Sequence, residues 1–347
     1  MSKHIPSDIE DDDLNAASRK KEHIDLAFKA RSSVRDIDSR FDYEPLFARH
    51  PQDYSALTTR FAGKTMDAPV WISSMTGGTQ KAAIINQNLA KACGEYRLGM
   101  GLGSCRQLLY SDAYLSDFQL RKYAGEQPFY ANLGIAQVES LLQSGNMFRM
   151  RELLDKLDAD GLIIHINPLQ EWLQPEGDRY TRAPLYTIQD VLEKLDISII
   201  VKEVGQGMGP ASIEALLRLP LTAIDFAANG GTNFALMEIL RSAPDIAEHY
   251  RSLVNIGHSA EEMVSLTNII SDRLGQDCLT GQVIVSGGIH DFLDGYYLTE
   301  KSKLPAVYGQ ASGFLKHAMG DYVELQEYIE MQLQGLALAK AILKVKS

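Results

Sequence analysis

The chain has 347 residues, a formal net charge of -11, 45% hydrophobic residues and 23% charged residues, as expected of a globular protein with a sizeable core. The acidic balance argues against nucleic acid as the main partner. No apolar run approaches the roughly 18 residues that a membrane span needs, and no signal-peptide core is present, so we expect a cytoplasmic protein without a membrane partner.

The first segment of the chain is strongly charged. Residues 10–13 are all acidic, and we expect a solvated, mobile tail there. Arg19, Lys20 and His23 come before weakly helical apolar spacing, which predicts these cations at the start of a helix. They form either a solvated basic turn or an arm that carries Arg19 and Lys20 to a phosphate group. Residues 40–67 are expected to be an irregular lead-in.

From residue 68 onwards, strand-like and helix-like segments alternate. This alternation is typical of a parallel sheet, and eight units over this length favour a (β/α)₈ TIM barrel over an open doubly wound sheet. We predict an N-terminal arm and lead-in at 1–67 and one barrel domain at 68–347, with long loops after strands 4 and 6. The strands are predicted at 69–74, 98–102, 128–132, 161–167, 198–205, 222–227, 282–286 and 305–308.

Two helices have specific signals. The segment 80–96 has an apolar face at Ile84, Ile85 and Leu89. Ser259, with Glu262 three residues later, forms a capping box that predicts a helix start.

The fourth predicted strand loses its apolar pattern as it ends. His165 and Asn167 share one face by the two-residue alternation of a strand, and Pro168 ends the ladder. Gln170 and Glu171 are expected in the loop that follows. The group is either a histidine satisfied in the core beside a polar turn, or a site where imidazole, carboxamides and a carboxylate converge.

Polar residues also follow the other predicted strands, which in a barrel places them on the catalytic rim. Small residues at Gly287-Gly288 and at 309–311 let backbone N–H groups approach a phosphate, although turns use glycine as well. Lys202 either lies at the edge of a planar ring system or forms a structural ion pair with Glu203. The polar rim residues are Thr76, Ser104, Arg106, Asn132, His165, Asn167, Gln170, Glu171, Lys202 and Thr232.

The motifs and their order resemble the type 2 isopentenyl diphosphate isomerases over nearly the whole chain. Enzymes of this family are FMN-containing TIM barrels that interconvert isopentenyl and dimethylallyl diphosphate in isoprenoid biosynthesis. They use Mg²⁺ and a flavin that is usually reduced by NADPH. The matching segments are 19–23, 75–78, 103–106, 165–171, 201–205, 230–232 and 287–289.

The resemblance implies a set of site residues. Gln170, His165 and Asn167 would be catalytic, and Glu171 would hold Mg²⁺ against the diphosphate, as a hard cation prefers. Substrate would be bound by Arg19, Lys20, His23, Arg106 and Gln170. FMN would be bound by Ser74, Met75, Thr76, Ser104, Asn132, Lys202, Thr232, Gly287, Gly288, Gln310 and Ala311. The chain departs from the usual family pattern at Cys105, Ala228, Asn229, His290 and Gln310.

We therefore expect an isopentenyl-diphosphate delta-isomerase. Moving a double bond requires a strong, well-placed acid in a dry site, and reduced flavin can act as acid and base there. One alternative is an FMN-dependent oxidoreductase of the 2-hydroxy-acid oxidase type, which would need a histidine base and rim arginines for a carboxylate. Another is a non-catalytic flavin- or phosphate-binding barrel.

The N-terminal arm also predicts an oligomer. An arm ahead of the first strand begins on the opposite side of the barrel from the rim, so we expect Arg19 and Lys20 to complete the site of a neighbouring subunit. The resemblance implies a homotetramer or a homo-octamer. Alternatively, residues 40–67 are long enough for the arm to fold back over its own rim.

Overall fold

The computed structural model describes residues 9–74 and 80–346. The chain divides into two compact units, one formed by residues up to Asp42 together with Lys346, and the other by residues Tyr43–Val345. The predicted domain boundary at 67/68 stays a prediction.

The first unit contains one long helix, α1 (Ile9–Leu26). Two expectations for this segment are wrong. The acidic run 10–13 lies in the first turns of α1 rather than in a tail, and Arg19 and Lys20 lie in its second half rather than at its start. Acidic residues near the N-terminus of a helix and cations near its C-terminus both complement the helix dipole, so the charge order itself favours a helix here.

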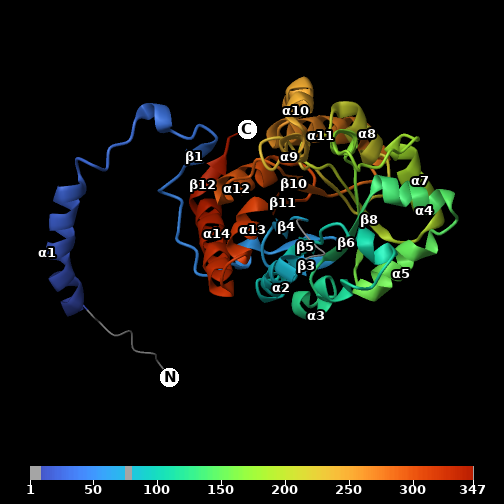
Figure 1. The fold of residues 1–347 in the computed structure, drawn as a ribbon. Helices are drawn as coiled ribbons and strands as arrows, with labels where there is room; N and C mark the ends of the chain where they lie inside the picture. The colour runs from blue at the N-terminus through green and yellow to red at the C-terminus, as the bar shows by residue number, and fades with distance from the viewer. Residues whose placement is uncertain (1–8, 75–79, 347) are drawn as a thin grey trace. The chain divides into compact units, whose positions relative to one another are not determined.

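The second unit is a closed barrel of eight parallel strands, and the predicted TIM-barrel fold is confirmed (Figure 1). The strands follow one another around the barrel in chain order, and the last closes on the first, with Gly309 paired to Trp71. They are β4 (Val70–Ile72), β5 (Gly99–Gly101), β6 (Phe129–Gly134), β7 (Gly161–His165), β8 (Ser198–Lys202), β9 (Ala223–Asp225), β10 (Val283–Ser286) and β11 (Ala306–Gln310).

Helices separate and surround the strands. Ser259 caps α11 by accepting from the backbone N–H of Glu262, so the predicted helix start is confirmed. The Glu262 side chain pairs with His258 Nδ1 at 2.9 Å, so only the serine half of the predicted capping box is present. In α2, Ile85 and Leu89 are buried, but Ile84 is 59% exposed, because a barrel helix buries only a narrow stripe. The helices are α2 (Gln80–Glu95), α3 (Arg121–Ala124), α4 (Ile135–Gln143), α5 (Phe148–Leu157), α6 (Pro168–Leu173), α7 (Pro184–Lys194), α8 (Pro210–Leu217), α9 (Phe234–Arg241), α10 (Pro244–Tyr250), α11 (Ala260–Leu274), α12 (Phe292–Lys301), α13 (Ser312–Ala318) and α14 (Tyr322–Ile342).

The lead-in contains regular structure that was not predicted. β2 (Thr59–Phe61) and β3 (Lys64–Met66) form an antiparallel hairpin, whose turn residues Ala62 and Gly63 both have positive φ. This conformation is typical of a tight hairpin turn. The remaining short strands are β1 (Phe41–Tyr43) and β12 (Leu343–Val345).

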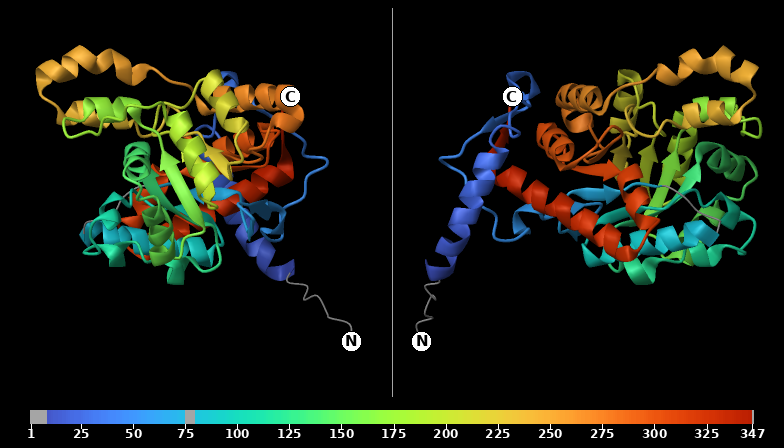
Figure 2. Two further views of the ribbon diagram at one scale, coloured as in Figure 1. Left: turned by 90° about the vertical axis from the view of Figure 1, so that its right-hand side faces the viewer. Right: turned by 60° about the vertical axis from the view of Figure 1, so that its left-hand side comes forward.

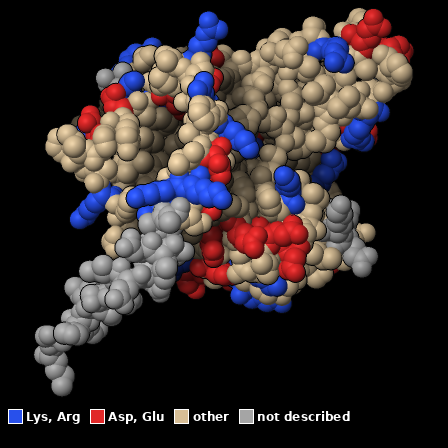
Figure 3. Space-filling model, turned by 90° about the vertical axis from the view of Figure 1, so that its left-hand side faces the viewer, with Lys and Arg blue, Asp and Glu red and all other residues tan. Residues whose placement is uncertain are grey.

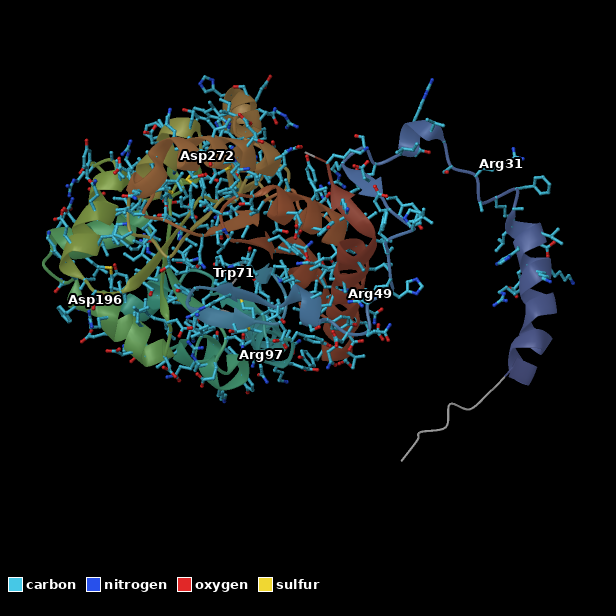
Figure 4. All side chains as sticks on the ribbon, turned by 180° about the vertical axis from the view of Figure 1, so that it is seen from behind. Arg31, Arg49, Trp71, Arg97, Asp196 and Asp272 are labelled. Carbon is cyan, nitrogen blue, oxygen red and sulfur yellow. The ribbon has the colours of Figure 1, made fainter. Side chains whose placement is uncertain are left out.

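The barrel interior is arranged in layers. The hairpin contributes to an apolar layer around Trp71, a fully buried side chain inside the ring of strands (Figure 4). This layer consists of Phe61, Met66, Trp71, Tyr130, Ile163, Ile200, Ala223, Ile284 and Val307. Two residues further along the strands, the alternation turns Asn132, His165, Lys202, Asp225 and Ser286 to the same interior. These five residues form a polar layer between the apolar layer and the rim.

The long segments after β7 and β9 pack together at the rim, where α6 contacts α9 (Figure 2). Their apolar side chains form a small separate core that includes Leu173, Ala235 and Ile239. The predicted long loops after the fourth and sixth strands are therefore partly helical.

Among the described residues, no helix is both long and apolar enough to cross a membrane. On the face drawn in Figure 3, acidic side chains gather in one area while basic side chains are scattered around it.

Candidate active site at the carboxyl ends of the strands

Two adjoining cavities lie where the barrel strands end. One has a volume of about 320 Å³ and is lined mainly by the loops after β9, β10 and β11. The other has a volume of about 300 Å³ and is lined mainly by residues that follow β5 to β8. Both cavities are lined by Ser74, Lys202, Val204 and Phe234, so these residues form a shared wall.

Glycine backbone shapes the first cavity, which we call the glycine cavity. Gly287 and Gly288 have φ of +92° and +71°, a conformation that other residues rarely adopt. A Cβ atom on Gly287 would lie 2.1 Å from the carbonyl oxygen of Ala228, and one on Gly230 would lie 3.2 Å from the Cα of Gly288. The glycines therefore allow the loops after β9 and β10 to touch. The predicted cofactor residues that line this cavity are Ser74, Lys202, Thr232, Gly287, Gly288, Gln310 and Ala311.

Polar side chains shape the second cavity, which we call the side-chain cavity. It brings together predicted substrate, catalytic and metal residues from separate loops, along with four residues predicted to bind the cofactor, of which Ser74 and Lys202 are shared with the glycine cavity. The predicted residues that line it are Ser104, Arg106, Asn132, His165, Asn167, Gln170 and Glu171, together with the shared Ser74 and Lys202.

The polar residues after β7 lie on a helix. Pro168 occupies the first turn of α6, so the expectation that Gln170 and Glu171 lie in a loop is wrong. The helical spacing brings Asn167, Gln170 and Glu171 together: Asn167 Nδ2 donates to Gln170 Oε1 at 3.0 Å and to Glu171 Oε1 at 3.1 Å. Glu171 is 8% exposed, and its Oε2 accepts from the backbone N–H of Asp178 at 2.6 Å.

A second carboxylate, which the sequence did not reveal, lies behind this group. Glu238 on α9 is 3% exposed and accepts from Gln170 Nε2 at 3.1 Å, while Arg241 pairs with its other oxygen at 2.6 Å. Its signal in the sequence is weak, because it is one acidic residue within an amphipathic helix. Only the packing of α9 on α6 brings it to the site.

His165 lines the side-chain cavity and is held as a neutral imidazole. Its Nδ1 lies 2.7 Å from Asn132 Oδ1, and Asn132 Nδ2 donates to the carbonyl oxygen of Leu102 at 3.0 Å. Because the amide oxygen can only accept, Nδ1 carries the proton and Nε2 has the lone pair. Burial and then the nearby charge of Lys202 lower the pKa of His165 to about 4.

Lys202 does not pair with the Glu203 carboxylate, so that alternative is wrong. Its Nζ donates to the Glu203 carbonyl oxygen at 2.7 Å. The Glu203 carboxylate instead accepts from the backbone N–H groups of Gly205, Gln206 and Gly207. Burial raises the pKa of this carboxyl group, and these bonds oppose the rise. Lys202 is therefore available to the two cavities that it lines.

Asp225 lies beside Lys202 in the polar layer, since the two residues are paired in the register of β8 and β9. Asp225 is fully buried, and Ser286 Oγ donates to its Oδ1 at 2.5 Å. Burial raises the pKa of its carboxyl group, while the charge of Lys202 lowers it. Lys202 and Asp225 therefore place a cation and a carboxyl group side by side, next to the wall that the two cavities share.

Unpartnered buried atoms lie in the cavity walls. The hydroxyl oxygens of Ser73 and Ser74 and Oδ1 of Asn167 have no hydrogen-bond partner in the described structure. Buried polar atoms without partners are rare, which fits walls that receive a polar ligand. Among the described residues no cluster of three or more His, Cys, Asp or Glu side chains forms a metal site.

The remaining predicted residues lie either outside the described residues or in the other compact unit. Met75 and Thr76 lie outside the described residues. Arg19, Lys20 and His23 lie exposed on α1 in the first compact unit. Their predicted contact with a diphosphate stays a prediction.

No family model matches the chain. Curated relatives named isopentenyl-diphosphate delta-isomerase do match it over nearly its whole length. The relative from Nostoc sp. is 35% identical over 329 residues, 92% of this chain and 89% of the relative. The relative from Cronobacter sakazakii is 34% identical over 337 residues, 94% of this chain and 92% of the relative. The relative from Rickettsia africae is 31% identical, over 92% of this chain and 91% of the relative.

Solved structures share the fold. A mandelate oxidase variant with a monooxide FMN adduct has a TM-score of 0.53 at 12% identity, covering 96% of this chain and 99% of that one. A flavocytochrome b2 variant with bound sulfite has a TM-score of 0.58 at 12% identity, covering 87% of this chain and 72% of that one. At such identity the likeness shows the barrel fold alone.

Proposed function

The chain belongs to the isopentenyl-diphosphate delta-isomerase family, as its sequence motifs predicted, and we propose that it interconverts isopentenyl and dimethylallyl diphosphate with a reduced flavin held beside the substrate. The observation that carries this proposal is the pair of adjoining cavities with Lys202 in their shared wall. One cavity suits a flavin phosphate and ring, and the other suits a diphosphate and its alkene. The alternative of a non-catalytic barrel does not account for the side chains gathered in the second cavity.

The glycine cavity supports FMN as the cofactor. Its loops bring backbone close to a ligand, and the unpartnered hydroxyls of Ser73 and Ser74 can donate to one. Ser74, Lys202, Thr232, Gly287, Gly288, Gln310 and Ala311 would hold FMN from this side, Ser104 and Asn132 would reach it from the other cavity, and Met75 and Thr76 would join them. When bound and reduced, the flavin supplies the acid and base that an alkene requires. The glycine turns are sized for one phosphate, so recovery of stoichiometric FAD from the purified protein would contradict this assignment.

The side-chain cavity supports a diphosphate held with Mg²⁺. Glu171 offers one buried carboxylate, and Mg²⁺ commonly binds one or two carboxylates together with substrate phosphates and water. Arg106 offers a guanidinium for forked phosphate contacts. Both residues line the same cavity.

His165, Asn167 and Gln170 would orient the alkene end of the substrate. His165 is neutral, with the Nε2 lone pair uncommitted to Asn132, and Gln170 is fixed by bonds from Asn167 and to Glu238. Neutral side chains held in this way keep bulk water out of the site. They also do not compete for the proton that is transferred to or from carbon.

We also propose a cytoplasmic homotetramer or homo-octamer in which Arg19, Lys20 and His23 of one subunit complete the diphosphate site of another. The support is the basic, exposed face of α1 and the position of this helix ahead of the first barrel strand. Mixing Arg19→Ala subunits with Glu171→Gln subunits, under conditions that allow exchange, tests the sharing. Recovered activity requires shared sites, and no recovery in proven mixed oligomers means that each arm serves its own barrel.

The activity test uses isopentenyl diphosphate with FMN, Mg²⁺ and NADPH as the reductant under anaerobic conditions. We expect dimethylallyl diphosphate to form with no net oxidation of the flavin. The second candidate, a 2-hydroxy-acid oxidase, shares the fold of the mandelate oxidase and flavocytochrome b2 structures. Oxygen consumption with a 2-hydroxy acid and no isomerisation would favour that candidate and overturn the proposal.

A further inference from the structure

Asp178 contacts both residues that are proposed to hold the diphosphate. Its backbone N–H donates to Glu171 Oε2 at 2.6 Å. Its carboxylate receives the guanidinium of Arg106, with Nη1 2.6 Å from Oδ2 and Nη2 3.4 Å from Oδ1. One residue therefore connects by its main chain to the candidate metal ligand and by its side chain to the candidate phosphate ligand.

The Asp178 side chain is itself anchored to the barrel. Gln137 Nε2 donates to Asp178 Oδ2 at 2.7 Å, and Gln137 Oε1 accepts from the backbone N–H of Gly134 at 3.1 Å. Gly134 is the last residue of β6. The Asp178 carboxylate thus has a fixed position relative to a barrel strand, although it belongs to a loop.

The turn that presents Asp178 is closed by main-chain contacts. A Cβ atom on Gly177 would lie 2.1 Å from the carbonyl oxygen of Glu171, so only glycine fits this approach. The guanidinium of Arg179 lies over the ring of Trp172 and donates to the carbonyl oxygens of Glu171, Gly177 and Trp172. These contacts fix the distance between Glu171 and the Asp178 backbone.

Arg106 needs such an anchor. Its side chain is 51% exposed, and a long exposed side chain loses rotamer entropy when it binds an anion. The pair with Asp178 uses the Nη1–Nη2 edge of the guanidinium, and the edge that contains Nε can face a phosphate. An anchored guanidinium binds with less entropy loss than a free one.

We propose that Asp178 is a positioning residue of the diphosphate site, which orders Arg106 and Glu171 relative to one another before the substrate arrives. This inference rests on the proposed function, since it concerns the groups that would bind the diphosphate and its Mg²⁺. A rival role is competition, in which Asp178 occupies Arg106 and must be displaced by the diphosphate. The two roles predict opposite effects of removing the Asp178 charge.

The test is calorimetric titration of the FMN-loaded protein with inorganic pyrophosphate and Mg²⁺. We expect Asp178→Asn to weaken pyrophosphate binding about tenfold, equivalent to about 1.4 kcal/mol. In the isomerase assay the same variant should raise KM with kcat changed less than about twofold, as for a group that supports ground-state and transition-state binding equally. In an Arg106→Ala background the effect of Asp178→Asn should fall below about twofold, because it acts through Arg106.

The matched control is Asp67→Asn. Asp67 pairs with Arg97 at 2.9 Å, and Arg97 is about as exposed as Arg106, but both residues precede their strands and so lie at the opposite end of the barrel. This variant should leave pyrophosphate affinity unchanged. Tighter binding by Asp178→Asn, unchanged binding, or an equal effect in the Arg106→Ala background would each overturn the inference. Failure of the parent protein to bind pyrophosphate would instead contradict the proposed diphosphate site itself.

Discussion

The glycine cavity is shaped by main chain, whereas the side-chain cavity beside it is shaped by hydrogen-bonded side chains. In the glycine cavity, positive φ angles and close loop contacts at Gly287 and Gly288 set the walls. In the side-chain cavity, Asn167, Gln170 and Glu171 hold one another through amide and carboxylate bonds. An added Cβ atom on Gly287 would overlap the main chain of Ala228, whereas the other wall depends on its hydrogen-bond donors and acceptors.

Glu171→Gln should cause the largest loss, because it removes the candidate metal ligand while leaving the glycine cavity intact. Loss of a metal-mediated contact costs several kcal/mol in the transition state, so we expect kcat/KM to fall by about 10³-fold with FMN still bound. Anaerobic kinetics measure the fall in kcat/KM, and the flavin content of the variant measures whether FMN is still bound. Glu176→Gln, an exposed carboxylate on the same segment, is the control. Near-normal activity and Mg²⁺ dependence would show that Glu171 is not the ligand.

Lys202→Met should damage both cavities, since Lys202 lines each of them. We expect the affinities for FMN and for pyrophosphate to fall, each by about 10-fold to 100-fold, as for loss of a charge-assisted contact. The substitution also leaves Asp225 buried without its neighbouring cation, which is destabilising. Adding Asp225→Asn should therefore restore stability without restoring ligand binding. Loss of one affinity alone would show that the two cavities do not share Lys202.

Gly287→Ala should affect the glycine cavity alone. The new Cβ would clash with the main chain of Ala228 at a φ of +92°, and we expect a loss of about 2 kcal/mol in the free energy of unfolding together with weaker FMN binding. Urea unfolding and FMN titration measure both effects. Gly281→Ala is the matched control, because a Cβ there meets nothing within 4 Å. Equal behaviour of the two variants would contradict the main-chain account of this cavity.

The smallest expected effect is the pH dependence of stability from His165 in the side-chain cavity. Its pKa is about 4 in the folded protein and near 6.5 when unfolded, so the unfolded state binds more protons between these values. The stabilising contribution is complete above pH 6.5 and is lost as the pH falls towards 4. We expect it to be roughly 1 kcal/mol, less than a fully dry site would give, because water enters the cavity.

Urea unfolding at pH 7.5 and pH 4.5 measures this contribution. The stability loss on acidification should be smaller in His165→Asn than in the parent protein, by the amount given above. His50→Asn, at an exposed histidine, serves as the control. An equal loss in the parent and in His165→Asn would contradict the neutral state of His165 in the cavity wall.

The barrel itself could be predicted from the sequence, because eight short strand-like segments alternate with helix-like segments and are followed by glycine or polar turns. The alternation also separated the face of His165 from that of Ile164, and the structure shows that the His165 face points inward, two residues beyond Ile163 of the apolar layer. Short helices were harder to predict from the sequence. The helical state of Gln170 and Glu171 depends on six residues after Asn167, too few to show a periodic pattern.

The partners of the site residues could not be predicted. Glu238 reaches Gln170 through the packing of α9 on α6, and Asp178 reaches Arg106 from a loop that is distant in the sequence. The sequence also could not decide whether Lys202 contacts a planar ring system or forms an ion pair with Glu203. Its position next to Glu203 in the chain does not show where its Nζ points. Contacts of this kind depend on loop geometry rather than on local pattern.

The most direct test of the account is titration of the FMN-loaded protein with pyrophosphate and Mg²⁺, followed by flavin absorbance and by the amount of flavin released. Two adjoining cavities predict that one pyrophosphate binds per chain, that the flavin spectrum shifts, and that FMN stays bound. Release of FMN in proportion to the pyrophosphate added would mean that both ligands compete for one anion site, which would contradict the division into two cavities.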